Sequence, residues 1–307
     1  MSMENFQLWK LILEAWRALI PYYEPIFQDF TTHNGLDSHG LGWLLAAITF
    51  EPDAITPTGL QIRTPYTAVE TFRRELKSIA DEGFFIETKP DDFLLTPSAR
   101  EQTVQLIDAG RIEMDKADPL PHSESKRVSE LLSKLVQGML GTPPPPDIWS
   151  VGLSCKLLPD KDPPLPYTEQ LVSCLNSYRD DSHIAAWQPS GLSAMAIEAL
   201  TFLWRGDATS LDALFEKLTH RGYPREVYAK SLEELREHGY LEGANDALHL
   251  TTNGKSFRKK IEHDTDQYFF APWVSLRDQE KEELTGLLIR LRDGLQVKII
   301  GGKSGLH

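Results

Sequence analysis

The stretch Glu237–Lys255, EHGYLEGANDALHLTTNGK, contains the pattern that decides the fold. Gly239 stands where a helix would end, because glycine readily adopts the left-handed backbone conformation of a helix C-cap. Two short apolar runs then flank the turn residues 243–246, which is the pattern of a β-hairpin. Thr251 follows at the position expected to open a new helix. The stretch therefore predicts a helix, a hairpin and a second helix in succession.

The same pattern occurs earlier in the chain, about 156 positions toward the N-terminus, where FFIETKPDDFLLT follows a glycine. Residues 36–85 align with residues 192–241 without a gap. Few residues are identical, but apolar positions and glycines agree. Aligned pairs include Leu41 with Ile197, Leu76 with Leu232 and Gly83 with Gly239. A shared order of elements at a nearly constant offset predicts a tandem repeat.

Each half is predicted to contain several helices around one hairpin, from the spacing of apolar residues and from capping residues. In the first half the expected helices lie around residues 9–20, 40–50, 56–62, 66–82 and 131–140. In the second half they lie around residues 167–178, 194–204, 210–219, 224–238 and 284–295. Ser210 is expected to cap its helix, and Pro224 suits a first helical turn.

This layout, with the sequence LEELREHGYLEG leading into LHLTTNGK, resembles the multiple-antibiotic-resistance-regulator (MarR) type of winged helix. The resemblance implies a mainly α fold with small β-hairpin wings. In that family the first and last helices of two chains interlock to form a dimer. Here the chain is similar to two such copies fused. The resemblance therefore implies two tandem winged helix-turn-helix domains that form an intramolecular pseudo-dimer, monomeric in solution, with the leucine and tryptophan stripes of the terminal helices as its core. The alternative is that a second chain pairs with each copy to give larger assemblies.

The predicted domains are residues 1–141 and residues 166–296, each a MarR-like winged helix. Residues 142–165, rich in proline at both ends, are expected to form a stiff, extended, non-helical linker. Residues 297–307 are expected to form a frayed C-terminal tail, although GGKSG superficially resembles a phosphate-binding loop.

Composition favours a cytoplasmic protein. No apolar run has the length of a membrane span, and Met1–Lys10 lacks the pattern of a signal peptide. Cys155 and Cys174 are the only cysteines, and neither has the spacing of a metal site, so reduced, buried or incidental thiols are expected. The net charge of −13 opposes non-specific binding to nucleic acid, yet an acidic protein can still bind DNA through one basic face.

By the resemblance, the second helix of each helix-turn-helix motif reads the DNA major groove and the wing contacts the minor groove or phosphate. The side chains that map to such contacts are basic. In the first half they are Arg63, Arg73, Arg74, Lys77 and Lys89, and in the second half His220, Arg221, Arg225 and Lys230. The alternative is that they are solvated helix residues paired with neighbouring glutamates, such as Glu70, Glu75, Glu226 or Glu234.

The wing tips oppose DNA binding. The first tip, residues 88–92, has one lysine followed by two carboxylates, and the second tip, residues 243–246, has no cation. Carboxylates that face phosphates repel them, which reduces affinity. The basic run 255–260 lies behind the second wing, where it is expected to pair with Glu262 and Asp264 rather than to contact the DNA backbone.

A second candidate site is a cleft for a small effector, which the resemblance places between the dimer core and the DNA-binding lobe. The predicted ligand-binding residues are Tyr23, Phe27, His33, His183 and Trp187. His183 and Trp187 are four residues apart and share a helical face. A flat aromatic effector is expected to stack there, the alternative being that these residues are ordinary core side chains.

An enzyme is not expected, because the sequence has no nucleophile elbow, no phosphate-binding loop and no dinucleotide-binding motif. No cofactor and no metal are predicted. The first hypothesis is therefore a transcriptional regulator that binds duplex DNA and responds to a small aromatic effector. The alternative is a degenerate tandem winged-helix protein that binds a small molecule or a protein partner and not DNA.

Overall fold

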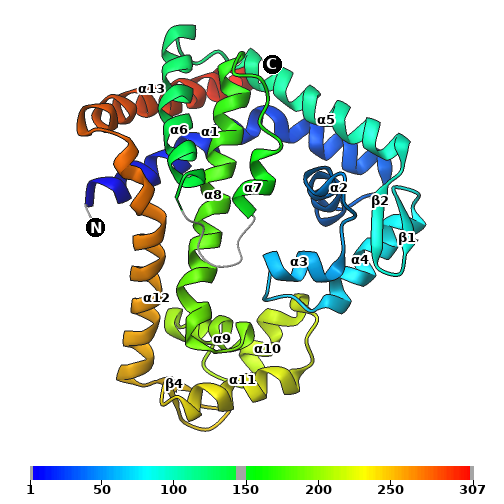
Figure 1. Ribbon diagram of the computed structural model, residues 1–307, viewed down its shortest axis with the longest axis vertical. Coiled ribbons are helices and arrows are strands. Elements are labelled where there is room, and N and C mark those ends of the chain that lie inside the picture. The colour runs from blue at the N-terminus through cyan, green and yellow to red at the C-terminus, as the bar shows by residue number, and fades with distance from the viewer. Residues whose placement is uncertain (1–2, 143–149, 305–307) are drawn as a thin grey trace. The chain divides into compact units, whose positions relative to one another are not determined.

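The computed structural model describes residues 3–142 and 150–304, which are mainly helical with two small antiparallel hairpins (Figure 1). This confirms the coarse prediction of the fold. The elements of the first half are α1 (Met3–Asn34), α2 (Ser38–Phe50), α3 (Pro57–Arg63), α4 (Val69–Asp81), β1 (Phe85–Lys89), β2 (Asp92–Leu95), α5 (Pro97–Lys116) and α6 (His122–Leu140).

The second half repeats this order of helices and hairpin after one further helix, α7. Its elements are α7 (Ser150–Cys155), α8 (Pro164–Trp187), η1 (Gln188–Ser190), α9 (Ala194–Arg205), α10 (Leu211–Leu218), η2 (Thr219–Arg221), α11 (Arg225–Glu237), β3 (Leu241–Glu242), β4 (His249–Leu250), α12 (Thr252–Phe270), η3 (Ala271–Ser275) and α13 (Asp278–Ser304).

Side-chain caps fix several of these boundaries, as the sequence predicts. The Ser210 hydroxyl accepts a hydrogen bond from the Ala213 amide at 3.1 Å, at the start of α10. Pro224, expected in the first turn of this helix, is instead the N-cap residue directly before α11, in an extended conformation. Gly83 and Gly239 follow α4 and α11 with φ angles of +87° and +69°, the left-handed conformation expected of a residue that ends a helix.

Several boundaries differ from the predictions; α1, for example, spans Met3–Asn34 and is much longer than residues 9–20. Ser150–Cys155 of the predicted non-helical linker forms α7, so the prediction is wrong there; residues 143–149 lie outside the described part of the chain. The reason is a tertiary contact, since the buried Asp181 carboxylate accepts a hydrogen bond from the Val151 amide at 3.0 Å, at the positive end of this helix. Helix α8 extends beyond residues 167–178 in both directions, and α13 continues through part of the predicted tail to Ser304.

The chain divides into two compact units, and neither unit is one half of the sequence. Unit 1 contains the residues up to Asp53, Leu95–Asp181 and the residues from Phe269 onward. Unit 2 contains Ala54–Leu94 and Ser182–Tyr268. Each unit therefore combines segments from both predicted repeats, and the unit boundaries do not coincide with residues 142–165.

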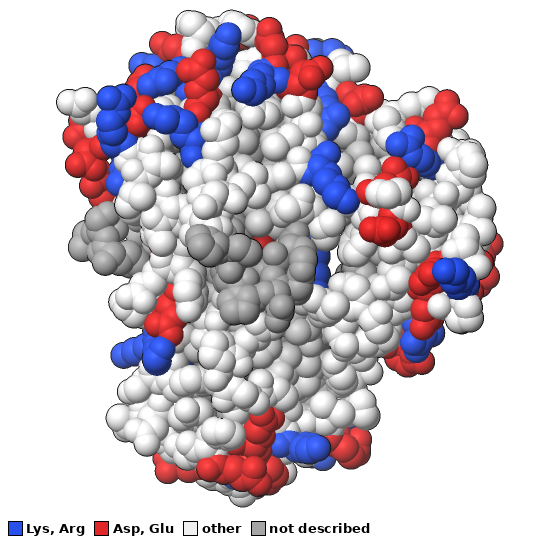
Figure 2. Space-filling model, viewed as in Figure 1, with Lys and Arg blue, Asp and Glu red and all other residues white. Residues whose placement is uncertain are grey.

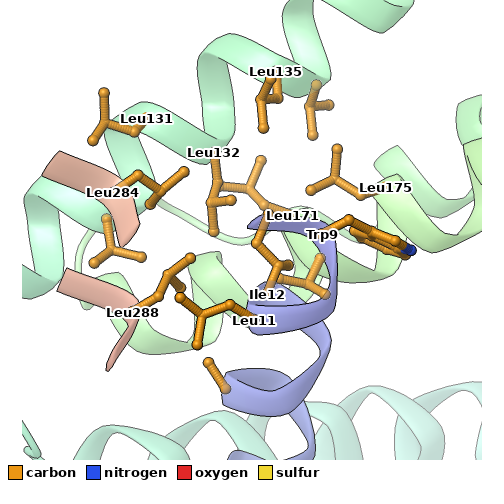
Figure 3. Packing of buried hydrophobic residues seen from close by; sticks show 14 of the residues in the cluster. Trp9, Leu11, Ile12, Leu131, Leu132, Leu135, Leu171, Leu175, Leu284 and Leu288 are labelled. Carbon is orange, nitrogen blue, oxygen red and sulfur yellow. The ribbon is translucent and has the colours of Figure 1, made fainter. Parts of the chain in front are cut away.

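The core of unit 1 is formed by helices that lie far apart in the sequence (Figure 3). Ile12 of α1, Leu132 of α6, Leu171 of α8 and Leu288 of α13 point toward one another, and each is at most 1% exposed. The apolar stripes of the first and last helices are therefore buried core, as the sequence predicts.

The core of unit 2 consists mainly of residues of α9, α10 and α11 and of the second hairpin. Leu200, Leu214, Tyr228 and Leu232 have no exposed surface. Tyr66 from the first half packs against this cluster. Helices α3 and α4 and the first hairpin thus belong to the same unit as α9–α11 and the second hairpin.

Candidate nucleic-acid interface

Helices α10 and α11 form a helix-turn-helix motif in the second half. Leu214 and Leu218 of α10 and Tyr228 and Leu232 of α11 are all buried in one cluster. The Tyr228 hydroxyl donates a hydrogen bond to the Leu218 carbonyl at 3.3 Å, which fixes the end of α10 against α11. Burial raises the pKa of Tyr228, so this hydroxyl stays protonated and available as a donor.

The second wing is attached to α11 by an arginine. In the β3–β4 hairpin Leu241 pairs with Leu250 and Glu242 pairs with His249. The Arg236 guanidinium donates to the Gly243 carbonyl at 3.0 Å and to Asn245 Oδ1 at 2.8 Å. The nearest α11 cation therefore holds the wing tip in place, and the tip itself has no lysine or arginine.

The first wing has an equivalent attachment. The Arg73 guanidinium on α4 donates to both carboxylate oxygens of Asp91, at 2.7 and 2.8 Å, and also pairs with Glu70. Asp91 lies between β1 and β2, and its amide donates to the Glu87 carboxylate at 2.9 Å. The hydrogen bond from Arg73 lowers the pKa of Asp91, so the pair stays ionised near neutral pH.

Within unit 2 the turn before α4 contacts the turn before α11, and we call this the turn–turn contact. The Ala68 amide donates to the Arg221 carbonyl at 2.9 Å, and Arg221 Nη1 donates to Thr67 Oγ1 at 3.2 Å. Gln61 Nε2 bonds both the Thr67 carbonyl, at 3.1 Å, and the Tyr223 hydroxyl, at 3.2 Å. The residues directly before α4, Thr67 and Ala68, are therefore bonded to the turn before α11.

Gly222 makes the turn–turn contact possible. Its φ angle is +77°, and a Cβ atom at this position would lie 1.8 Å from Thr71 Oγ1. No side chain fits at that distance without displacing the backbone or Thr71. Gly206 in the same unit has φ of +75°, but nothing lies within 4 Å of its Cβ position.

Gly222→Ala is expected to destabilise unit 2 by about 2–3 kcal/mol, because left-handed strain and a steric clash add together. Gly206→Ala is the matched control and is expected to cost about 1 kcal/mol, from the backbone conformation alone. Urea unfolding measures both. Hydrogen exchange of the Ala68 amide gives a local measure, since this amide should lose protection in Gly222→Ala only. Equal losses of stability in the two variants would contradict the close approach.

Arg221 also holds a buried carboxylate. The Glu198 residue is 7% exposed, and its Oε1 atom lies 2.9 Å from the Arg221 Nε and Nη2 atoms. The Arg221 guanidinium lies 5.9 Å from the centre of the Tyr66 ring. Burial raises the pKa of Glu198, and the Arg221 charge opposes that shift. Sequence reasoning missed Glu198, although a glutamate within the apolar helix 194–204 was a signal of a buried ion pair.

The predicted DNA contacts fall into three groups. Arg73, Arg221 and Arg225 are engaged in ion pairs, Arg225 with Asp212 at 2.6 Å. Arg63 is half-buried at the end of α3. The others are exposed, and the structure gives them no ion pair within residues 3–142 and 150–304: Arg74, Lys77, Lys89, His220 and Lys230. For Arg73, Arg221 or Arg225 to contact DNA, each must first release its carboxylate partner.

Acidic side chains surround the exposed cations of the second half. Glu226, Glu233 and Glu237 of α11 are exposed, as are Glu242 and Asp246 of the second hairpin. Figure 2 shows Asp and Glu atoms gathered at the end of the view where Figure 1 places α11 and this hairpin. A phosphate that approaches this face meets carboxylates of the same sign, which lowers affinity.

The basic run 255–260 pairs with the following turn of α12, as predicted. Arg258 bonds Glu262 at 2.5 Å, and Lys260 pairs with Asp264. Arg258 is only 3% exposed and lies over the Trp204 ring, 5.3 Å from its centre. This arginine is therefore part of the core of unit 2.

Three predicted ligand residues lie in unit 1. The Tyr23 and Phe27 rings are 5.4 Å apart, and Phe27 covers Gly110 of α5. The Tyr23 hydroxyl donates to the Glu169 carboxylate at 3.4 Å. His33 is exposed near the end of α1. These contacts are those of a packed helix pair, with His33 outside it.

The other two predicted ligand residues lie in unit 2. Trp187 is 5% exposed, and its ring centre is 6.2 Å from that of Tyr66. His183 Nδ1 lies 3.3 Å from the Thr265 hydroxyl. Both residues are on α8, as their spacing predicts. They belong to a different unit from Tyr23, Phe27 and His33.

Two kinds of site are absent from the described part of the chain. The residues that the structure describes contain no cluster of histidine, cysteine, aspartate or glutamate able to hold a metal ion. Among the described helices, none combines the length and apolar character needed to cross a membrane.

A comparison with known protein families matches residues 155–298 to one described as "Helix-turn-helix family". The matched segment covers α8 to α13 except the last residues of α13, and it includes the α10–α11 motif and the second hairpin. It therefore supports a helix-turn-helix domain in this part of the chain. Neither the curated proteins nor the solved structures gave a match.

Proposed function

We propose that this protein is a cytoplasmic transcriptional regulator that binds duplex DNA, built as a fused MarR-like pseudo-dimer. The observation that carries the proposal is the match to a helix-turn-helix family over residues 155–298, because it falls on the α10–α11 motif and its wing. The first half supplies a second set of helices and a hairpin in the same order. A helix-turn-helix protein of this kind reads base edges with its second helix.

The turn–turn contact limits how DNA is bound. Two recognition helices that enter successive major grooves lie about 34 Å apart, one turn of DNA. In unit 2 the Ala68 amide, at the start of α4, is 2.9 Å from the Arg221 carbonyl, shortly before α11. Both recognition helices therefore bind successive grooves only after this contact opens. We propose that the closed arrangement is the resting state and that a small aromatic effector changes the balance between the closed and open states.

The proposal predicts a specific complex with DNA whose affinity falls steeply with salt, since phosphate contacts release counterions. Labelled genomic fragments, including the region upstream of the protein's own gene, are titrated at several salt concentrations. Lys230→Ala, at an exposed α11 cation, is expected to lower affinity about 3- to 10-fold and to reduce the salt slope by about one. Lys126→Ala on α6 changes the net charge equally and is expected to have no effect.

A second candidate function is binding of a small molecule or protein without DNA. The observation that favours it is the chemistry of the motif, where Arg73, Arg221 and Arg225 already have carboxylate partners and the second wing tip has no cation. If no fragment binds even at low salt, the regulator proposal is wrong and this candidate replaces it. A thermal-shift screen with aromatic metabolites then tests the effector site, where stabilisation should be lost in Trp187→Ala.

A further inference from the structure

The two cysteines lie next to each other in unit 1, although they are 19 residues apart in the sequence. Cys155 is the last residue of α7, and Cys174 lies in α8. Their Sγ atoms are 3.0 Å apart, and both are free thiols. Sequence reasoning missed this pair, because neither residue belongs to a short cysteine motif.

Neighbouring hydrogen bonds hold the end of α7 on α8. Gln170 Nε2 donates to the Ser154 carbonyl at 2.9 Å, and the Ser154 and Ser173 hydroxyls are 3.4 Å apart. Disulfide formation requires the two sulfur atoms to approach to about 2.05 Å, a movement of about 1 Å. The contact therefore places the thiols close to bonding distance.

The environments of the two thiols differ. Cys155 is half-buried, whereas Cys174 has no exposed surface. The Cys174 thiol stabilises the Cys155 thiolate by hydrogen bonding and so lowers the pKa of Cys155. The hydrogen bond with Cys155, burial and the neighbouring Cys155 charge raise the pKa of Cys174. Cys155 is thus the accessible thiol that ionises first, and Cys174 keeps its proton.

We propose that Cys155 and Cys174 form an oxidant-sensitive dithiol that closes to an intramolecular disulfide when the protein meets a hydroperoxide. The Cys155 thiolate attacks the peroxide oxygen, the O–O bond breaks, and Cys155 becomes a sulfenic acid while hydroxide, or the alkoxide of an organic peroxide, leaves. The Cys174 sulfur then attacks the Cys155 sulfur, and the sulfenic oxygen leaves as water with the Cys174 proton. Each thiol loses one electron, and the peroxide gains these two electrons.

The disulfide would link α7 covalently to α8. At present α7 is held by hydrogen bonds, through Val151 to Asp181 and through Ser154 to Gln170. A covalent link removes the freedom of this segment to leave α8. Disulfides of this kind in reducing compartments are usually transient sensors, which fits a pair that is free in the resting protein.

The test uses the full-length reduced protein and hydrogen peroxide. After quenching, the protein is unfolded, alkylated with iodoacetamide and weighed by mass spectrometry. The expected product is about 2 Da lighter than the reduced protein, takes up no alkyl group, regains two thiols with dithiothreitol, and gives a cross-linked peptide containing Cys155 and Cys174. Two thiols that still alkylate, a disulfide between chains, or sulfinic acids without a cross-link would overturn the proposal.

Two variants assign the roles. In Cys174→Ser the sulfenic acid has no resolving partner and should be trapped on Cys155 by dimedone. In Cys155→Ser the buried Cys174 should react at least 10-fold more slowly with peroxide, since access and thiolate fraction both control the rate. Equal reactivity of Cys174 in that variant contradicts the assigned order. Because the readout is thiol chemistry, failure of the DNA-binding proposal leaves this test unaffected.

Discussion

Arg221→Ala is expected to destabilise the protein by about 3 kcal/mol, because it leaves the Glu198 carboxylate buried without its partner. The variant also removes the hydrogen bond to Thr67 and the contact with the Tyr66 ring. Urea unfolding at pH 7.5 measures the loss as a lower midpoint with an unchanged slope. Since Arg221 is also a predicted DNA contact, a loss of DNA binding alone does not separate the two roles.

A second substitution and the pH dependence of stability separate the role of Arg221 in holding Glu198 from its role as a DNA contact. Glu198→Gln removes the charge, so Arg221→Ala combined with Glu198→Gln should recover part of the stability lost in the single variant. The folded-state pKa of Glu198 is already raised, and loss of Arg221 raises it further. A folded state that takes up a proton more readily than the unfolded state becomes relatively more stable as the pH falls. The deficit of Arg221→Ala should therefore shrink from pH 8 toward pH 5, and a constant deficit would falsify the buried-charge explanation.

Leu132→Ala is expected to destabilise unit 1 by about 3–4 kcal/mol. Leu132 has no exposed surface, and its side chain lies among residues of α1, α8 and α13 (Figure 3). Removal of this side chain loses buried apolar surface and leaves a cavity that neighbouring helices fill only in part. Thermal unfolding followed by far-ultraviolet circular dichroism should show a lower midpoint.

Leu140→Ala is the matched control for this prediction. Leu140 lies on the same helix but is 52% exposed, so its replacement should change stability by no more than about 0.5 kcal/mol. Similar losses in the two variants would mean that α6 is stabilised by helix propensity and not by the shared core. A large effect of Leu132 alone supports the core that Figure 3 shows.

Local signals in the sequence were sufficient for most elements. Ser210 caps α10 through its own hydroxyl, and Gly239 ends α11 with a positive φ angle, as predicted from residue type alone. The stripes containing Ile12 and Leu288 have helical spacing, and both residues are buried. Each of these predictions depends on interactions within a few residues or on the apolar face of one amphipathic helix.

The rest depends on contacts between distant residues, which periodicity does not encode. The sequence places Cys155 and Cys174 far apart, and only the packing of α7 on α8 brings their sulfurs to 3.0 Å. The turn–turn contact joins Ala68 to Arg221 across the two halves. Basic side chains likewise look available for DNA in the sequence. Arg73 of α4, however, pairs with Asp91 between β1 and β2, and this ion pair depends on how the hairpin packs on α4.

The discontinuous make-up of the two units has a consequence for synthesis on the ribosome. The core of unit 1 needs both α1 and α13, which lie far apart in the sequence, since Ile12 and Leu288 share one cluster. During translation the apolar face of α1 therefore stays without its α13 partners until the ribosome has synthesised α13. Exposed apolar helices in such nascent chains are prone to aggregate and to bind chaperones. We expect the yield of folded protein to depend strongly on chaperone supply, more than for a chain whose halves fold one after the other.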